Sequence, residues 1–215
     1  FSTDLIVFNI FLLLIYVFGF LSDKNILPNP NVIILLQIFI LLSLAIFSQL
    51  KIVNLENYYL NEMLENKLFN IFFTVFCLAI LINGSNFLDG LNGLLSGYYL
   101  MVIISIIYVG NNYNNIDLIF ENELKILFFS LFIFFIFNIL GKVYLGDGGS
   151  YLIATLIGYY LIKFSLSNSD VSPYYIAVLL WYPAFENLFS LTRRFLVKNT
   201  ISSPYNEHLH QLVFL

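Results

Sequence analysis

Seven long apolar runs dominate the sequence and limit what the chain can fold into. Each run is close to the roughly 20 residues that an α-helix needs to cross a bilayer. Nothing in them shows the alternating apolar and polar pattern of a membrane β-strand. We therefore predict an all-α, polytopic transmembrane protein, with about seven membrane helices over residues 5–22, 31–50, 68–82, 93–109, 124–140, 149–166 and 172–189.

The composition supports this class of protein. Of the 215 residues, 60% are hydrophobic and 10% are charged, whereas soluble globular domains average roughly 45–50% and about 25%. The formal net charge is −4, and the Lys and Arg residues form no basic stripe, so nucleic-acid binding has no support. We expect one membrane domain over residues 1–215, embedded in a lipid bilayer.

The ends of the sequence indicate a piece of a longer protein. The first residue is Phe1 rather than Met, and residues 212–215 look like the start of another apolar segment. We therefore expect helices to be missing from this sequence at one or both ends.

The connections between the apolar runs alternate in character. The first, third, fifth and seventh runs are followed by segments that carry acids, amides, glycines or histidines, at 22–24, 83–93, 141–150 and 192–212. In a bundle that crosses the membrane repeatedly, these four segments lie on one face. Arg193 and Arg194 directly follow the seventh run, and the positive-inside rule therefore places this face in the cytoplasm.

The stretch 83–97, NGSNFLDGLNGLLSG, interrupts the otherwise apolar sequence directly after the third apolar run. It contains Asn83, Asn86, Asp89 and Asn92. An ionised carboxylate costs several kcal/mol to remove from water unless it is paired, bound to a metal or open to a wet cavity, so such groups at a membrane boundary indicate a functional site. The glycines among them permit tight turns and close approach of a ligand. We interpret this stretch as a ligand-binding helix end.

Hard oxygen donors gather on the same face. Carboxylates and amides spread over several loops suit Mg²⁺, with Mn²⁺ as the alternative, held jointly by the protein and by substrate phosphates. Zinc would require a denser set of His and Cys. The GDGGS sequence at 146–150 opens an apolar run and offers free backbone N–H groups to an anion such as a diphosphate. Taken singly, DGLNG also fits a turn, and GDGGS also fits a helix cap. The candidate residues are Asp23, Asn86, Asp89, Asn92, Asp147, His208 and His210.

These motifs resemble those of the polyprenyl-phosphate N-acetylhexosamine-1-phosphate transferase family. NGSNFLDGLNGLLSG resembles the family's N-x-x-N-x-x-D-G-x-D/N-G-L motif, and GKVYLGDGGSYL is similar to its F-x-G-D-x-G-S segment. SPYNEHLHQL resembles the H-x-H-H loop, and GFLSDKNILPNPNVIILLQ resembles the aspartate-pair region. The four motifs follow the family's order and cover nearly the whole chain.

The resemblance implies an Mg²⁺-dependent enzyme at the cytoplasmic face of the bacterial inner (plasma) membrane. It would transfer N-acetylhexosamine-1-phosphate from a UDP-sugar to undecaprenyl phosphate and release UMP. This step starts a cell-surface polysaccharide, such as the O-antigen of lipopolysaccharide or a cell-wall glycan. Both reactants are anionic, so a cation that neutralises them makes physical sense.

The resemblance also assigns roles to individual residues. Asp147 would bind Mg²⁺ and the diphosphate, Asn86 and Asp89 would line the nucleotide and metal pocket, and Asp23 would lie beside the lipid phosphate. The three aspartates are therefore candidate catalytic residues and metal ligands. The remaining candidates for substrate binding are Asn83, Asn92, Gly148, His208 and His210.

The sequence departs from the family pattern at three positions. Where the family has two adjacent aspartates, this chain has Ser22 and Asp23, so the role of the first aspartate is either moved or lost. Asn92 replaces the second aspartate of the D-G-x-D-G motif, as in eukaryotic members. Gln211 stands where a third histidine is common, and this argues against the branch that makes the first peptidoglycan lipid intermediate.

Two other functions remain open. A catalytically silent member of the same family is suggested by Ser22. The second alternative is a membrane transporter with acidic residues inside the membrane. A transporter is expected to show inverted repeats and charges near the mid-plane of the bilayer, whereas the polar motifs here gather at one face. The sequence leaves open whether the chain forms a homodimer, and whether the reaction uses a covalent aspartyl intermediate.

Overall fold

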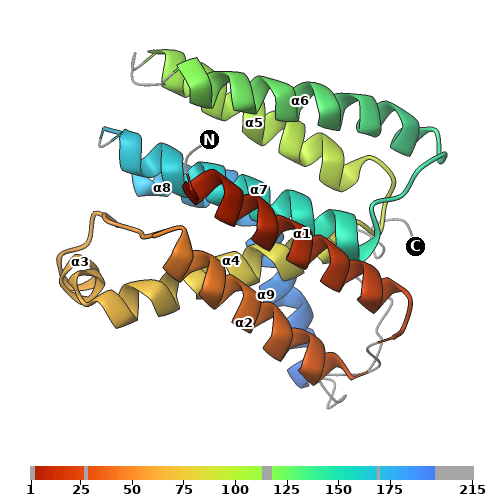
Figure 1. The fold of residues 1–215 in the computed structure, drawn as a ribbon, viewed down its shortest axis with the longest axis horizontal. Helices are drawn as coiled ribbons and strands as arrows, with labels where there is room; N and C mark the ends of the chain where they lie inside the picture. The colour runs from red at the N-terminus through yellow and green to blue at the C-terminus, as the bar shows by residue number, and fades with distance from the viewer. Residues whose placement is uncertain (1–2, 27–28, 113–117, 169, 197–215) are drawn as a thin grey trace.

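The computed structural model describes residues 3–26, 29–112, 118–168 and 170–196, and these parts of the chain are helical, with no strand (Figure 1). The all-α prediction is therefore confirmed. In chain order the helices are α1 (Thr3–Asp23), α2 (Pro30–Phe47), α3 (Tyr58–Glu65), α4 (Lys67–Leu88), α5 (Leu94–Asn112), α6 (Leu118–Ile139), α7 (Gly146–Ser167), α8 (Pro173–Leu179) and α9 (Trp181–Leu196).

Five of the described helices, α1, α4, α5, α6 and α7, are long and apolar enough to cross a membrane. The apolar part of α2, Asn31–Phe47, is slightly shorter. Each of the first six predicted segments coincides with one of these helices, which confirms a polytopic membrane protein. Many of their large apolar side chains are exposed on the outside of the bundle, for example Leu35, Phe39, Met101 and Phe129, as expected for surfaces that face lipid.

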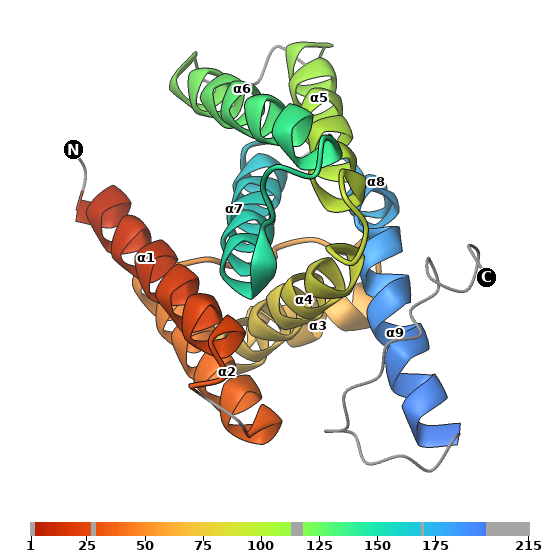
Figure 2. The ribbon, with the colours of Figure 1, turned by 90° about the vertical axis from the view of Figure 1, so that its right-hand side faces the viewer.

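The seventh predicted segment, 172–189, does not form a single membrane helix. Ser172 caps α8 through its side chain and Pro173 opens it, but α8 ends at Leu179 after seven residues. The chain then turns into α9, where Pro183 lies in the first turn, a position at which proline costs no hydrogen bond. Figures 1 and 2 together show that α9 runs at a steep angle to α7.

The segment 51–67, which connects two of the predicted membrane helices, is not wholly irregular. It contains the short helix α3, and the Asn57 side chain caps its start by accepting a hydrogen bond from the Leu60 N–H. Asparagine is among the strongest N-cap residues. The sequence signal for this helix was therefore present in Asn57.

Helix α7 packs against α1, α4 and α5, so it holds the bundle together. Figure 2 shows α7 between α1 on one side and the α5–α6 hairpin on the other. Lipid tails are as apolar as a protein core, so helices in a membrane associate through close packing and interhelical hydrogen bonds rather than through the hydrophobic effect. The centre of this packing consists of fully buried side chains, including Leu41, Leu44, Ile82, Leu95, Ile103, Ala154 and Ile157.

Glycines let two helix pairs approach until their backbones touch. A Cβ atom on Gly19 of α1 would lie 2.5 Å from the Cα of Gly148 on α7. A Cβ atom on Gly84 of α4 would collide with the carbonyl oxygen of Pro183 on α9. Small residues at such crossings are typical of membrane helix pairs. The crossing of α1 and α7 at Gly19 lies one turn before the end of α1, so it determines where that end lies relative to α7.

We predict that Gly19→Ala lowers the melting temperature of the protein in detergent. The added methyl group has to push α1 away from α7, and overpacking of this kind costs about 1–3 kcal/mol. The matched control is Gly97→Ala, whose nearest contact would be a Phe135 ring atom at 2.9 Å, in a side chain that can move, rather than the backbone of another helix. Identical melting temperatures for the wild type and Gly19→Ala would contradict the close approach of the two helices.

Candidate active site

Three aspartates mark the end of α1, the end of α4 and the start of α7, and these helix ends face the viewer in Figure 2. Asp23 is the last residue of α1, Asp89 caps the C-terminus of α4, and Asp147 is the second residue of α7. The candidate site is built around the first turn of α7. The four N–H groups at the start of any α-helix have no partner within that helix.

Asp23 supplies partners for two of these N–H groups. Its Oδ1 accepts a hydrogen bond from the Asp147 N–H at 3.0 Å, and its Oδ2 accepts one from the Gly148 N–H at 3.3 Å. The residue before the helix, Leu145, makes no capping hydrogen bond through its side chain. A carboxylate at this position is also favoured by the positive end of the helix dipole. A side chain of α1 therefore caps α7.

Gly146 is required by this contact. Its φ angle is +61°, a left-handed conformation that glycine adopts without strain. A Cβ atom on Gly146 would also lie only 2.6 Å from the Asp23 Oδ2. Any other residue here would displace the carboxylate from the start of α7, which gives a physical reason for the first glycine of the GDGGS motif.

Ser22 contacts the second aspartate of the site. Its hydroxyl donates a hydrogen bond to the Asp147 Oδ2 at 2.7 Å. The position that departs from the family's aspartate pair therefore holds a donor aimed at a neighbouring carboxylate. Ser22 and Asp23 together connect the end of α1 to the side chain and the backbone of Asp147.

A further hydrogen bond connects α7 to α4. The Ser150 hydroxyl lies 3.0 Å from the Asn86 Oδ1 and 3.1 Å from the Asp147 carbonyl oxygen, and it can donate to either. Asn86 lies one turn before Asp89 on α4. The polar residues of the two motifs at 83–93 and 141–150 are thus in direct contact, although 64 residues separate Asn86 from Ser150.

Asp89 has the most perturbed acidity outside the membrane-spanning segments. Burial and, to a smaller extent, the negative charges of Asp147 and Asp23 together raise the pKa of its carboxyl group to about 7, against the lowering effect of a hydrogen bond with the Gly146 backbone. Each carboxylate disfavours ionisation of its neighbours. The site therefore concentrates negative charge that a bound cation would relieve.

The other candidates have different surroundings. Asn83 donates hydrogen bonds to the Gln37 Oε1 at 3.1 Å and to the Ala79 carbonyl oxygen at 2.8 Å, so it connects α4 to α2. Gly148 is buried against α1, and Asn92 is exposed in the α4–α5 connection. His208 and His210 lie outside the described residues.

Two polar residues that sequence reasoning missed support this end of the bundle. Gln37 is 1% exposed and pairs with Asn83. Asn138 is 3% exposed; it accepts a hydrogen bond from the Gly93 N–H at 2.7 Å and donates one to the Val143 carbonyl oxygen at 2.8 Å. Asn138 thereby ties the α4–α5 turn to the α6–α7 connection. The available signal was an amide with apolar neighbours on both sides within each apolar run.

The donor set fits a hard divalent cation. Its members are carboxylate and amide oxygens, which Mg²⁺ and Mn²⁺ prefer. Within residues 3–26, 29–112, 118–168 and 170–196, no three His, Cys, Asp or Glu side chains form a ready-made ion site.

Two cavities lie at the opposite end of the bundle, one lined by the end of α2, α3 and the start of α4, the other by α4, α7 and α8. Neither contains an aspartate of the site. We place the candidate active site at the aspartates, because converging carboxylates at a helix N-terminus have chemistry that the cavities lack.

Comparison with known proteins identifies the class. The family model for glycosyl transferase family 4 matches residues 5–165, and the chain belongs to this family. The comparison confirms the family that the motifs predicted. No solved structure matches the chain.

Two curated relatives carry related names. The chain is 31% identical to the "Undecaprenyl-phosphate alpha-N-acetylglucosaminyl 1-phosphate transferase" of Thermotoga maritima over 143 residues. This aligned region covers 66% of this chain and 42% of the relative. It is 29% identical to the "Probable undecaprenyl-phosphate N-acetylglucosaminyl 1-phosphate transferase" of Bacillus subtilis over 204 residues. This aligned region covers 92% of this chain and 54% of the relative. The chain thus spans about half the length of the curated relatives it matches.

The pKa of Asp89 predicts how stability depends on pH. Because this pKa of about 7 in the folded protein lies above the ordinary aspartate value, the folded state binds more protons than the unfolded state between about pH 4 and pH 7. The Asp89 contribution to the free energy of unfolding therefore decreases as the pH rises through this window. Asp89→Asn removes that contribution.

Melting temperatures in detergent, measured across this pH window, check the prediction. The melting temperature of Asp89→Asn should fall less with rising pH than that of the wild type. Asp170→Asn, at an exposed position, should behave like the wild type. Parallel pH profiles for the wild type and Asp89→Asn would contradict the raised pKa.

Proposed function

We propose that this chain is the membrane-embedded catalytic part of a UDP-sugar:undecaprenyl-phosphate sugar-1-phosphate transferase. The proposal rests on the convergence of Asp23, Asp89 and Asp147 at the first turn of α7, in a chain whose relatives are named for transfer onto undecaprenyl phosphate. By analogy with those names, the sugar is N-acetylglucosamine. The site faces the cytoplasm of a bacterial inner membrane, and the product starts a cell-surface polysaccharide.

The net reaction moves one phosphoryl group. A bond forms between an oxygen of the lipid phosphate and the β-phosphorus of the UDP-sugar, and the bond from that phosphorus to the α,β-bridging oxygen breaks, so UMP leaves. Both reactants are strongly anionic, and catalysis of such a transfer consists mainly of positioning and charge neutralisation. Asp89 and Asp147 would hold Mg²⁺ or Mn²⁺, and the ion would supply that neutralisation.

The residues of this chain position the groups that meet the substrate. Asp23 holds the first turn of α7 at the end of α1 through the N–H groups of Asp147 and Gly148. Ser22 fixes the orientation of the Asp147 carboxylate, and Ser150 connects this turn to Asn86. Preorganisation of this kind favours an enzyme over a catalytically silent relative. The three aspartates lie at one end of the helix bundle, and this position favours an enzyme over a transporter, whose charged residues lie near the mid-plane of the bilayer.

Removal of the central carboxylate tests the assignment. We predict that Asp147→Asn abolishes formation of lipid-linked sugar from labelled UDP-N-acetylglucosamine, undecaprenyl phosphate and Mg²⁺, a loss of at least about 100-fold. The control Asp170→Asn changes the same residue type at an exposed position and should retain wild-type activity. Full activity of Asp147→Asn, scored as organic-soluble label, would refute the site.

Ser22 offers a second, graded test. Ser22→Ala should lower kcat about tenfold while the protein stays folded, because a hydrogen bond to a charged group contributes about 1.5–3 kcal/mol. The matched control is Ser130→Ala, whose hydroxyl donates to the Ile126 carbonyl oxygen in its own helix. If Ser22→Ala and Ser130→Ala have equal kcat values, Ser22 does not orient Asp147.

A further inference from the structure

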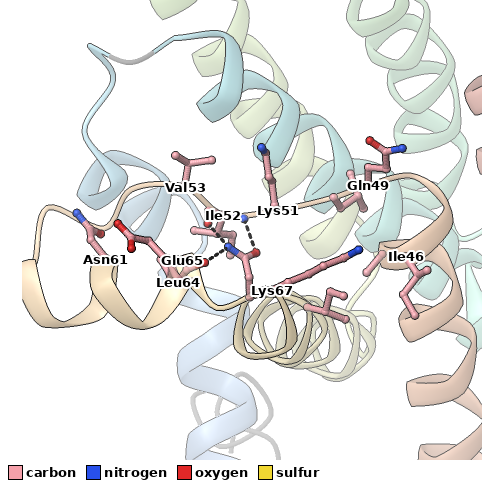
Figure 3. Close-up of a pocket in the computed structure, with 13 residues that line it drawn as sticks. Ile46, Gln49, Lys51, Ile52, Val53, Asn61, Leu64, Glu65 and Lys67 are labelled. Atoms are coloured by element: carbon pink, nitrogen blue, oxygen red, sulfur yellow. Dashed lines mark hydrogen bonds between the residues drawn. The ribbon is translucent and has the colours of Figure 1, made fainter.

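A preformed pocket lies at the end of the bundle opposite to the candidate active site. It has a volume of about 710 Å³ and is bordered by the end of α2, the segment 49–53, α3 and the start of α4 (Figure 3). This size is within the range of small-molecule sites. The proposed reaction does not use this pocket.

Hydrogen bonds from one buried side chain shape the pocket. Asn70 of α4 is 8% exposed. Its Nδ2 donates to the Ile52 carbonyl oxygen at 2.7 Å and to the Leu64 carbonyl oxygen at 2.9 Å, and its Oδ1 accepts the Ile52 N–H at 3.1 Å (dashed lines in Figure 3). Asn70 thus fastens both the segment after α2 and the end of α3 to α4. The walls are held by the fold and need no ligand to form.

The charged groups of the pocket favour an anion. Lys51 and Lys67 both line it, and neither ammonium group forms an ion pair within the part of the chain that the structure describes. Glu65 is the acidic residue in the lining. Figure 3 shows its carboxylate on the α3 side of the pocket, whereas the Lys67 side chain extends toward α2. The two cations are therefore available to a negatively charged ligand.

A second cavity shares lining residues with the first and is almost entirely apolar. It has a volume of about 290 Å³ and lies between α4, α7 and α8, where Phe73, Leu78 and Leu161 are in its lining. Lys51 and Ile52 line both cavities. A cationic side chain thus stands where a charged pocket meets an apolar one, an arrangement that matches a molecule with an anionic head and a hydrocarbon chain.

We propose that this end of the bundle binds one anionic glycerophospholipid of the bilayer. Its headgroup contacts Lys51 and Lys67, and one acyl chain occupies the cavity between α4, α7 and α8. The acyl chain gains little binding free energy from entering the cavity, because the surrounding lipid is equally apolar. The selectivity of the site therefore comes from the charge of the headgroup. This proposal does not depend on the proposed enzymatic function.

Competition between lipids of different charge tests the headgroup contact. The protein is placed in nanodiscs with equal amounts of phosphatidylglycerol and phosphatidylcholine, and retained lipid is identified by native mass spectrometry. Phosphatidylglycerol should be retained preferentially. The double variant Lys51→Gln/Lys67→Gln should bind it about 25-fold more weakly, about fivefold for each lysine.

The control is Lys163→Gln, which removes a lysine near the end of α7 whose ammonium group lies over the Tyr159 ring. This variant should retain phosphatidylglycerol as the wild type does. Equal retention of the two lipids by the wild type, or undiminished retention of phosphatidylglycerol by the double variant, would overturn the proposal.

Photo-crosslinking tests the position of the acyl chain independently of any substitution. Phosphatidylglycerol with a diazirine in its acyl chain should label α4 between residues 73 and 81 and the cavity-lining residues of α8, as located by peptide mass spectrometry. Phosphatidylcholine that carries the same diazirine in its acyl chain should label these positions weakly. Labelling confined to the outer surface of α6, with none in the cavity, would exclude the proposed binding mode.

Discussion

The contact between the Asp23 carboxylate and the first turn of α7 is the interaction on which the candidate site depends. It is made possible by two glycines: Gly19, which lets α1 touch α7, and Gly146, which leaves room for the carboxylate. Once Asp23 accepts the N–H groups of Asp147 and Gly148, the end of α1 is fixed at the start of α7. Ser22 is then in place to orient the Asp147 side chain.

This arrangement concentrates negative charge at one end of a membrane bundle. Burial and the charges of Asp147 and Asp23 bring the pKa of Asp89 to about 7, so the apo site resists full ionisation. A divalent cation that arrives with a diphosphate would relieve the repulsion and supply the remaining oxygen ligands. In the proposed reaction, the repulsion between carboxylates that lowers stability would thus favour binding of a metal ion together with phosphates.

The sequence predicted the helices and the meeting of the motifs, but it did not predict several supporting contacts. Apolar run length located α1, α2 and α4–α7, and the alternation of the connections placed Asp23, Asp89 and Asp147 on one face. The break between α8 and α9 was missed because residues 172–189 are apolar enough and long enough for a single helix. Gln37 and Asn138 were missed because an isolated amide in an apolar run reveals its partner only when helices from distant parts of the chain pack together.

The transfer of the β-phosphate is the most direct test of the central claim that these carboxylates serve phosphoryl transfer rather than simple sugar transfer. The protein is incubated in membranes with UDP-N-acetylglucosamine labelled with ³²P in the β-phosphate, undecaprenyl phosphate and Mg²⁺. Our account predicts that the label enters the lipid fraction and that unlabelled UMP is released. Label that stays in the aqueous phase as UDP, with sugar alone joined to the lipid, would contradict it.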